Sequence, residues 1–167
     1  LIRIPIPGGF ADTNELEVTE VQGQLIGSVT IANSGTLALA YTTAAPVEAV
    51  TIVDLAGEAP MRGIRLRKSL RAVALSPDGT RALLLHARDE SGSPDAGGID
   101  EEQRIDRSEG YSLLDTESGF AKLQLTGARV RERDLVVTPG ATRMFALLRD
   151  DNAVSYTHLT LPTNREV

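Results

Sequence analysis

Cysteine is absent from this 167-residue chain, and aromatic residues make up only 4% of it, with no tryptophan. The absence of cysteine excludes disulfide bonds and thiolate metal sites, but it does not fix the compartment. No apolar run approaches the roughly 20 residues that a membrane-spanning helix needs, so no membrane span is predicted. The segment 1–7 alternates and contains proline, unlike a signal peptide. The first residue is not methionine, and we expect the natural sequence to begin further upstream.

The negative charge belongs to one segment. The chain has a formal net charge of −6, and residues 89–109, with eight acidic and two basic residues, account for all of it. The rest of the sequence is balanced. The overall acidity therefore does not indicate a general preference for basic partners.

One turn pattern occurs three times between apolar runs. The copies are Ala32-Asn33-Ser34-Gly35-Thr36-Leu37, Ser76-Pro77-Asp78-Gly79-Thr80-Arg81 and Thr138-Pro139-Gly140-Ala141-Thr142-Arg143. In the second copy Pro77 presets φ, Asp78 can bond its own backbone and Gly79 tolerates positive φ. Hairpins that recur at about 40–50 residues are typical of β-propeller blades. The pattern predicts an all-β fold of antiparallel four-stranded blades, forming an incomplete propeller.

Period-2 patterns between the turns predict the strands. We expect one blade over 25–68, with strands at 25–31, 36–42, 47–55 and 63–67. We expect a second over 69–128, with strands at 70–75, 81–86, 111–114 and 121–125 and a polar insertion at 89–109. Residues 129–153 begin a third blade, with strands at 134–137 and 142–148. Residues 1–24 supply the outer strands of a preceding blade, at 1–6 and 15–21. No helix is predicted.

Two aspartates support this alignment. Asp54 precedes Pro77, and Asp115 precedes Pro139, by nearly the same interval. The alternative is an all-β sandwich with coincidental turns. Strand order separates the two folds, because a blade pairs its strands one-two-three-four, whereas a sandwich crosses between sheets.

The end of the chain has the sequence of a translated sequencing adapter. Residues 154–163 read Val-Ser-Tyr-Thr-His-Leu-Thr-Leu-Pro-Thr. The adapter codons GTC TCT TAT ACA CAT CTG ACG CTG CCG ACG encode the same residues without a mismatch. The alternative is a natural strand followed by a loop. We expect 154–167 to be a non-native tail, which removes His158 from consideration as a functional residue.

The turn residues of 76–81, read with the strands around them, resemble the "SPDG" repeats of bacterial β-propellers of the TolB-like and YVTN type. The resemblance covers roughly residues 15–153. It implies four antiparallel strands per blade around a central channel, non-enzymatic binding in most members, and a periplasmic or exported location. It also implies that the loops after the second and fourth strands of each blade share one face. The acidic insertion would then lie beside the basic segment 65–71 and beside Arg129, Arg131 and Arg133.

The insertion contains the carboxylates that could bind a metal. Oxygen ligands of this kind suit Ca²⁺, and the candidates are Asp95, Asp100, Glu101 and Glu102. Their spacing does not match an EF-hand loop. A solvated loop of glycine, serine, proline and acidic residues is the alternative interpretation, and we expect no metal and no cofactor.

Charged residues of the loops are the candidates for partner binding. They are Arg65, Arg67, Lys68, Arg71, Asp89, Glu90, Arg129 and Arg131. The alternative is a solvated strand edge, where Lys and Arg discourage edge pairing. No aromatic residues interleave with the basic ones, which argues against a single-stranded nucleic-acid platform. The expected partner is a protein or a small ligand.

No catalytic motif is apparent. The sequence has no Gly-x-Ser-x-Gly elbow and no phosphate-binding loop. His86 ends a strand, and we expect it at the surface without a catalytic partner. The leading hypothesis is a binding or scaffolding module that uses the face carrying 89–109. The alternative is an accessory or gating propeller domain of a larger, hydrolase-like enzyme.

Overall fold

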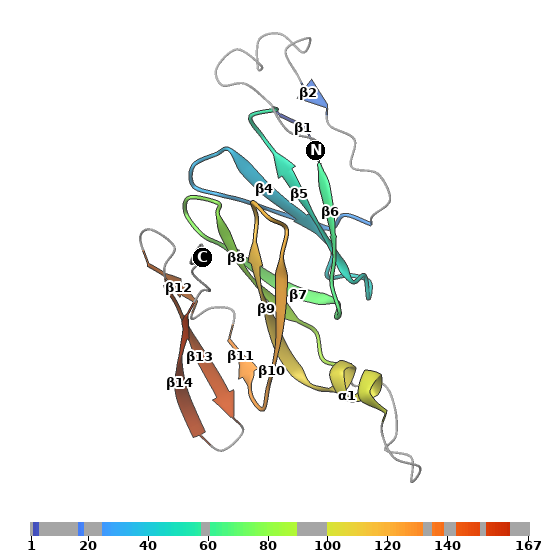
Figure 1. Ribbon diagram of the computed structural model, residues 1–167, viewed down its shortest axis with the longest axis vertical. Coiled ribbons are helices and arrows are strands. Elements are labelled where there is room, and N and C mark those ends of the chain that lie inside the picture. Colours follow the sequence, from blue (N-terminus) through green and yellow to red (C-terminus); the bar gives the residue numbers. More distant parts are fainter. Residues whose placement is uncertain are drawn as a thin grey trace, which may run out of the picture.

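The computed structural model describes residues 2–3, 17–18, 25–57, 61–89, 100–131, 135–138, 143–150 and 153–160. These residues are mostly antiparallel strands, arranged in three four-stranded sheets and one two-stranded sheet (Figure 1). None of the helices among them has the length and apolar character needed to cross a membrane.

The first two four-stranded sheets are simple meanders. The first sheet has the order β3 (Ser28–Ile31), β4 (Leu37–Tyr41), β5 (Ala49–Asp54) and β6 (Arg62–Arg65). The second has the order β7 (Leu70–Leu75), β8 (Arg81–His86), β9 (Glu109–Asp115) and β10 (Ala121–Thr126). Every strand pairs with the next one along the chain, as in propeller blades and unlike a sandwich. The predicted all-β fold of four-stranded blades is confirmed.

The third sheet starts earlier than predicted. β11 (Arg129–Val130) and β12 (Val136–Val137) both pair with β13 (Arg143–Asp150). The sheet thus begins at Arg129, before the predicted range 134–137. The first strands of the three four-stranded sheets lie within the predicted segments 25–68, 69–128 and 129–153. The boundaries of these segments stay predictions.

Two further strand pairs lie near the ends of the chain. β14 (Ala153–Thr160) pairs with β13, and β1 (Ile2–Arg3) pairs with β2 (Glu17–Val18). Any extended segment can pair with an open strand edge, because the pairing uses backbone groups. The adapter origin of 154–163 and the place of 1–24 in a preceding blade therefore both stay predictions.

The recurring turn closes with the same backbone hydrogen bond in its three copies. The first amide donates to the last carbonyl, from Ala32 to Leu37 at 2.9 Å, from Ser76 to Arg81 at 2.8 Å and from Thr138 to Arg143 at 3.0 Å. Gly35 and Gly79 have φ values of 71° and 79°, which glycine adopts without strain. In the second copy the Asp78 carboxylate accepts bonds from the Ser76 hydroxyl at 2.7 Å and the Thr80 amide at 3.1 Å.

The two aspartates noted in the sequence also occupy repeated positions, and the turns of two sheets contact each other. Asp54 pairs in register with Leu37, and Asp115 pairs with Arg81, so the aspartates occupy equivalent positions of their sheets. The Ser34 amide donates to the Pro77 carbonyl at 3.1 Å, which joins the turns of the first and second sheets.

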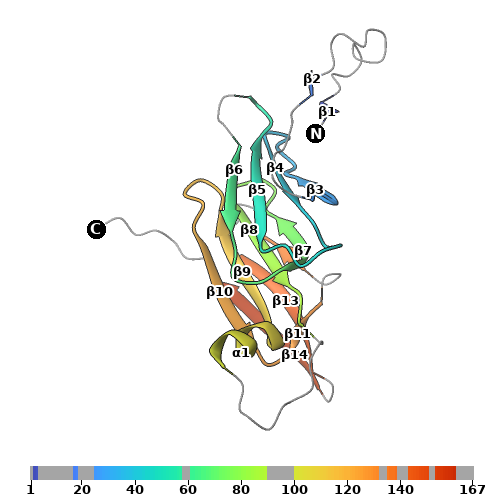
Figure 2. The same ribbon diagram turned by 90° about the vertical axis from the view of Figure 1, so that its right-hand side faces the viewer.

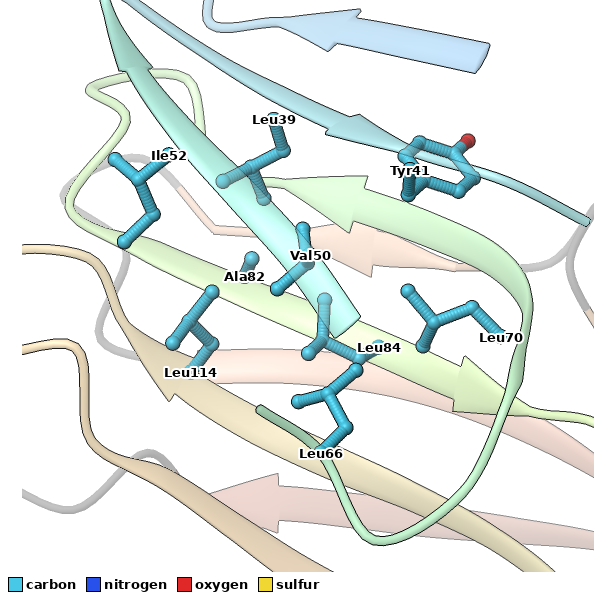
Figure 3. Packing of buried hydrophobic residues seen from close by; sticks show 9 residues of the cluster. All are labelled: Leu39, Tyr41, Val50, Ile52, Leu66, Leu70, Ala82, Leu84 and Leu114. Atoms are coloured by element: carbon cyan, nitrogen blue, oxygen red, sulfur yellow. The ribbon is translucent and has the colours of Figure 1, made fainter. Parts of the chain in front are cut away.

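Hydrophobic packing joins the sheets. β8 is buried on both faces, since Ala82, Leu83, Leu84, Leu85 and His86 are all 0% exposed. One of its faces packs against the first sheet, in the cluster drawn in Figure 3, which consists of Leu39, Tyr41, Val50, Ile52, Leu66, Leu70, Ala82, Leu84 and Leu114. The other face packs with Val130 of the third sheet. β8 is therefore the shared centre of both packing layers.

The insertion contains a helix that the sequence analysis did not predict. Helix α1 (Glu101–Arg107) begins at Asp100, whose side chain accepts a bond from the Gln103 amide at 2.8 Å. Ile105 is its buried residue. The cap and the acidic first turn stabilise a helix that is too short to show a clear amphipathic period.

Substituting Gly79 tests the contact between the first two turns. A Cβ at Gly79 would lie 3.1 Å from the Cβ of Ala32, whereas a Cβ at Gly35 would meet nothing within 4 Å. Both Gly→Ala variants add left-handed strain of roughly 1–2 kcal/mol. We expect Gly79→Ala to lower the free energy of unfolding by more than Gly35→Ala does, measured by urea denaturation. Equal losses would contradict the packing of one turn on the other.

Candidate functional site

The candidate site is the end of the sheets where the insertion meets the basic segment 65–71. We define this "loop face" by residues 43–48, 65–71, 87–89, 100–109 and 129–131. The Lys68 ammonium donates to the carbonyls of Ile105 at 2.6 Å and Asp106 at 2.7 Å. The described end of the insertion therefore lies beside the segment 65–71, as expected. Figure 2 shows α1 at one end of the sheets.

Lys68 does not lie on the surface. It is only 2% exposed, so the alternative interpretation, a solvated strand edge, is wrong for this residue. Burial lowers its pKa, and the nearby carboxylates of Asp106 and Glu109 oppose that effect. The ammonium is occupied by the carbonyls at the end of α1, where a cation is also favoured by the helix dipole. Lys68 thus ties the insertion to the sheets rather than offering a charge to a partner.

His86 is also buried, and the expectation of a surface histidine is wrong. It is 0% exposed, with Nδ1 3.1 Å from the Lys68 carbonyl and 3.2 Å from the Ser69 carbonyl. Because carbonyls only accept, Nδ1 carries the proton and Nε2 accepts from the Ser112 hydroxyl at 2.7 Å. Desolvation lowers the pKa of His86 to about 4, so the imidazole is neutral at pH 7.

The Ser112–His86 pair has the hydroxyl-to-imidazole bond that activates a nucleophilic serine. Its surroundings differ from those of a catalytic pair, since Ser112 is 3% exposed and His86 is 0% exposed. The second ring nitrogen faces backbone carbonyls rather than a carboxylate. A substrate cannot reach the hydroxyl without opening the packing between sheets. The pair therefore satisfies buried polar groups and holds the backbone that carries Lys68.

Arg71 is likewise used inside the protein. Its Nε donates to the His86 carbonyl at 3.1 Å, and its terminal nitrogen donates to the Val130 carbonyl at 2.6 Å. The residue is half-buried and joins the second sheet to the third. Contact of Arg71 with a partner stays a prediction.

Of the other partner-binding candidates, five are exposed and one lies outside the residues that the structure describes. Those that are exposed on the loop face are Arg65, Arg67, Asp89, Arg129 and Arg131. Glu90 lies outside the described residues. The Asp89 amide donates to the Asp106 carbonyl at 2.9 Å, so the first residue of the insertion is bonded to a residue near its end.

Three of the four metal candidates lie at the start of α1, and two of them make hydrogen bonds there. Asp100 caps the helix, and Glu101 bonds to Arg104 at 2.6 Å, which lowers the pKa of Glu101. Glu102 is exposed. Asp95 lies outside the described residues. In the described part of the chain, no three acidic or histidine side chains are grouped closely enough to hold a metal ion. Metal binding by the insertion stays untested.

The loop face contains two hollows. The first, of about 400 Å³, lies between the loop 43–48, the segment 68–70, residues 87–89 and Asp106. The second, of about 560 Å³, is lined by Glu48, Arg65, Leu66, Arg67, Glu101 and Glu102. Both include residues that follow different strands of the first two sheets. The arrangement provides concave, charged surface at the contact between those sheets.

The buried histidine predicts a pH dependence of stability. The pKa of His86 is about 4 in the folded protein against 6.5 for an ordinary histidine, so the folded protein binds fewer protons than the unfolded chain between these values. Stability therefore falls as the pH falls through this window, by about 2 kcal/mol between about pH 7 and pH 5. We expect His86→Gln to reduce this loss in urea titrations and His158→Gln to leave it unchanged. An unchanged slope in His86→Gln would contradict the assignment.

Removing the Lys68 tether should release α1. In Lys68→Met the carbonyls of Ile105 and Asp106 lose their charged donor, whereas Arg67→Met removes an exposed charge from the neighbouring position. We expect amides 104–107 to exchange hydrogen faster in Lys68→Met, relative to the amides of β8, and to be unaffected in Arg67→Met. Unaltered exchange in α1 of Lys68→Met would show that the tether does not hold the helix.

Comparison with known proteins supports the fold and no family. No protein-family model matches the sequence, and no curated protein is similar to it. The fold is similar to that of Kuenenia stuttgartiensis hydrazine synthase, with a TM-score of 0.50 and 18% identity over 75% of this chain and 32% of the other. It is also similar to the tricorn protease, a propeller-containing protein, with a TM-score of 0.56 and 11% identity over 86% of this chain. The chain spans 13% of that protease. At these identities the likeness shows a β-propeller-like fold alone.

Proposed function

We propose that the chain is part of a β-propeller binding or scaffolding module whose loop face engages a protein or ligand. The observation that carries the proposal is the attachment of α1 to the segment 65–71 through buried Lys68. A buried, bonded ammonium fixes an otherwise short helix beside exposed charged residues. Such preorganisation favours binding, since less side-chain and loop freedom is lost when a partner arrives.

The chemistry of the face also favours binding. Its exposed groups are guanidinium and carboxylate groups around hollows, which suit electrostatic recognition of a partner. The hydroxyl–imidazole pair nearest to the face, Ser112 with His86, is closed off from solvent. The loop face thus has exposed charged groups that can contact a partner, while Ser112 and His86 are buried.

The alternative is that the module is an accessory or gating domain of a larger enzyme. The two similar structures described above are named as enzymes, a synthase and a protease, and the chain corresponds to a minor part of each. The uninterrupted gene around this sequence separates the two proposals. A catalytic domain encoded beside the blades would favour the accessory role, and a gene that ends after the last blade would favour the binding module.

Partner capture tests the role of the loop face. The parent protein would be cross-linked in its own cells, and captured partners compared among the wild type, a variant in which a short turn replaces 90–107, and Glu117→Lys. Glu117 is exposed and lines a hollow with Gly79 and Thr80 of the turn. We expect a specific partner to be lost in the loop variant and retained in Glu117→Lys. Retention of that partner by a folded loop variant would contradict the proposal.

A further inference from the structure

We propose that the second hollow binds a peptide segment that carries both an acidic and a basic side chain. We name this hollow the "mixed-charge groove", lined by Glu48, Arg65, Leu66, Arg67, Glu101 and Glu102. The inference rests on the proposed binding function and specifies the chemistry of the partner.

Opposite charges come to the groove from different parts of the chain. Arg65 and Arg67 belong to the end of β6 and the segment that follows it, whereas Glu101 and Glu102 begin α1. All four side chains are exposed. Among the described residues, neither guanidinium is bonded to a carboxylate of the groove. The hydrogen bond from Arg104 is the main cause of the lowered pKa of Glu101, and the positive charge of Arg67 is the smallest contribution. The Glu101 carboxylate is bonded to Arg104, so the available negative charge of the groove comes from Glu102 and Glu48, opposite Arg65 and Arg67.

The backbone pattern of residues 65–68 explains this availability. Arg65 and Arg67 are exposed, while Leu66 and Lys68 are 5% and 2% exposed. Exposed and buried residues thus alternate here, although β6 ends at Arg65 and residues 67 and 68 lie in a bend. The Leu66 amide donates to the Glu48 carbonyl at 2.8 Å and fixes the segment. The inward Lys68 holds α1, and the outward arginines are left to face solvent beside it.

The charges select the class of ligand. A carboxylate can accept paired bonds from a guanidinium, and an ammonium or guanidinium of the partner can bond to Glu102 or Glu48. A ligand of one sign would meet repulsion from half of the lining, whereas a ligand with both signs satisfies both sides. Small-molecule sites bury most of their ligand, and the exposed lining here does not. A peptide, which extends over the surrounding loop face, fits better than a free amino acid.

Short synthetic peptides test this inference directly. The probes are fluorescein-labelled glycine peptides of equal length that carry one aspartate and one lysine, two aspartates, or two lysines. Each would be titrated by fluorescence anisotropy against the wild type, Arg67→Glu, Glu102→Lys and Arg129→Glu. Arg129 is an exposed arginine of the loop face that does not line the groove. Unchanged circular dichroism of each variant would establish that it is folded.

We expect the mixed peptide to bind roughly tenfold more tightly than either single-sign peptide, and to lose this advantage in Arg67→Glu and Glu102→Lys but not in Arg129→Glu. Equal affinity for the three peptides, equal loss in Arg129→Glu, or equally tight binding of free lysine or aspartate would overturn the inference. Failure of all peptides to bind would also overturn it. The proposed function would stand in each case if partner capture still depended on residues 90–107.

Discussion

The burial of β8 on both of its faces is the constraint on which the rest of the structure depends. Leu84 faces the first sheet and Leu83 and Leu85 face the third, so one strand contributes to both packing layers. A strand buried on both faces must be apolar at successive positions, as the run Ala82–Leu85 is. The turn before β8 makes a second connection between the first two sheets, because the Ser34 amide donates to the Pro77 carbonyl.

The polar end of β8 connects this core to the loop face. His86 extends the buried run, and a buried imidazole requires partners for both nitrogens. Those partners are Ser112 on the next strand and the carbonyls of Lys68 and Ser69. Lys68 in turn bonds to the carbonyls at the end of α1. The position of α1 thus follows from buried groups, Lys68 and His86 among them.

The sequence predicted what depends on local chemistry. The turn at 76–81 and the strands 70–75 and 81–86 agree with the structure, because turn residues and alternation act over short distances. Burial of Lys68 and His86 was not predicted, since it depends on α1 and on β9, which are distant in sequence. Signals for both existed: Asp100 and Gln103 have the spacing of a helix cap, and His86 directly follows a fully apolar run. The sequence pattern did not distinguish Lys68, which is buried, from Arg65 and Arg67, which are exposed.

Residue-resolved amide hydrogen exchange of the folded chain tests the central position of β8 most directly. If β8 is shared by both packing layers, amides 83–85 exchange only through global unfolding, with the free energy measured by denaturation. Amides of the outer strands β6 and β10, each paired on one side only, exchange through smaller openings. Exchange of amides 83–85 as fast as that of β6 and β10 would contradict the account, because the sheets would then open without disrupting the strand that joins them.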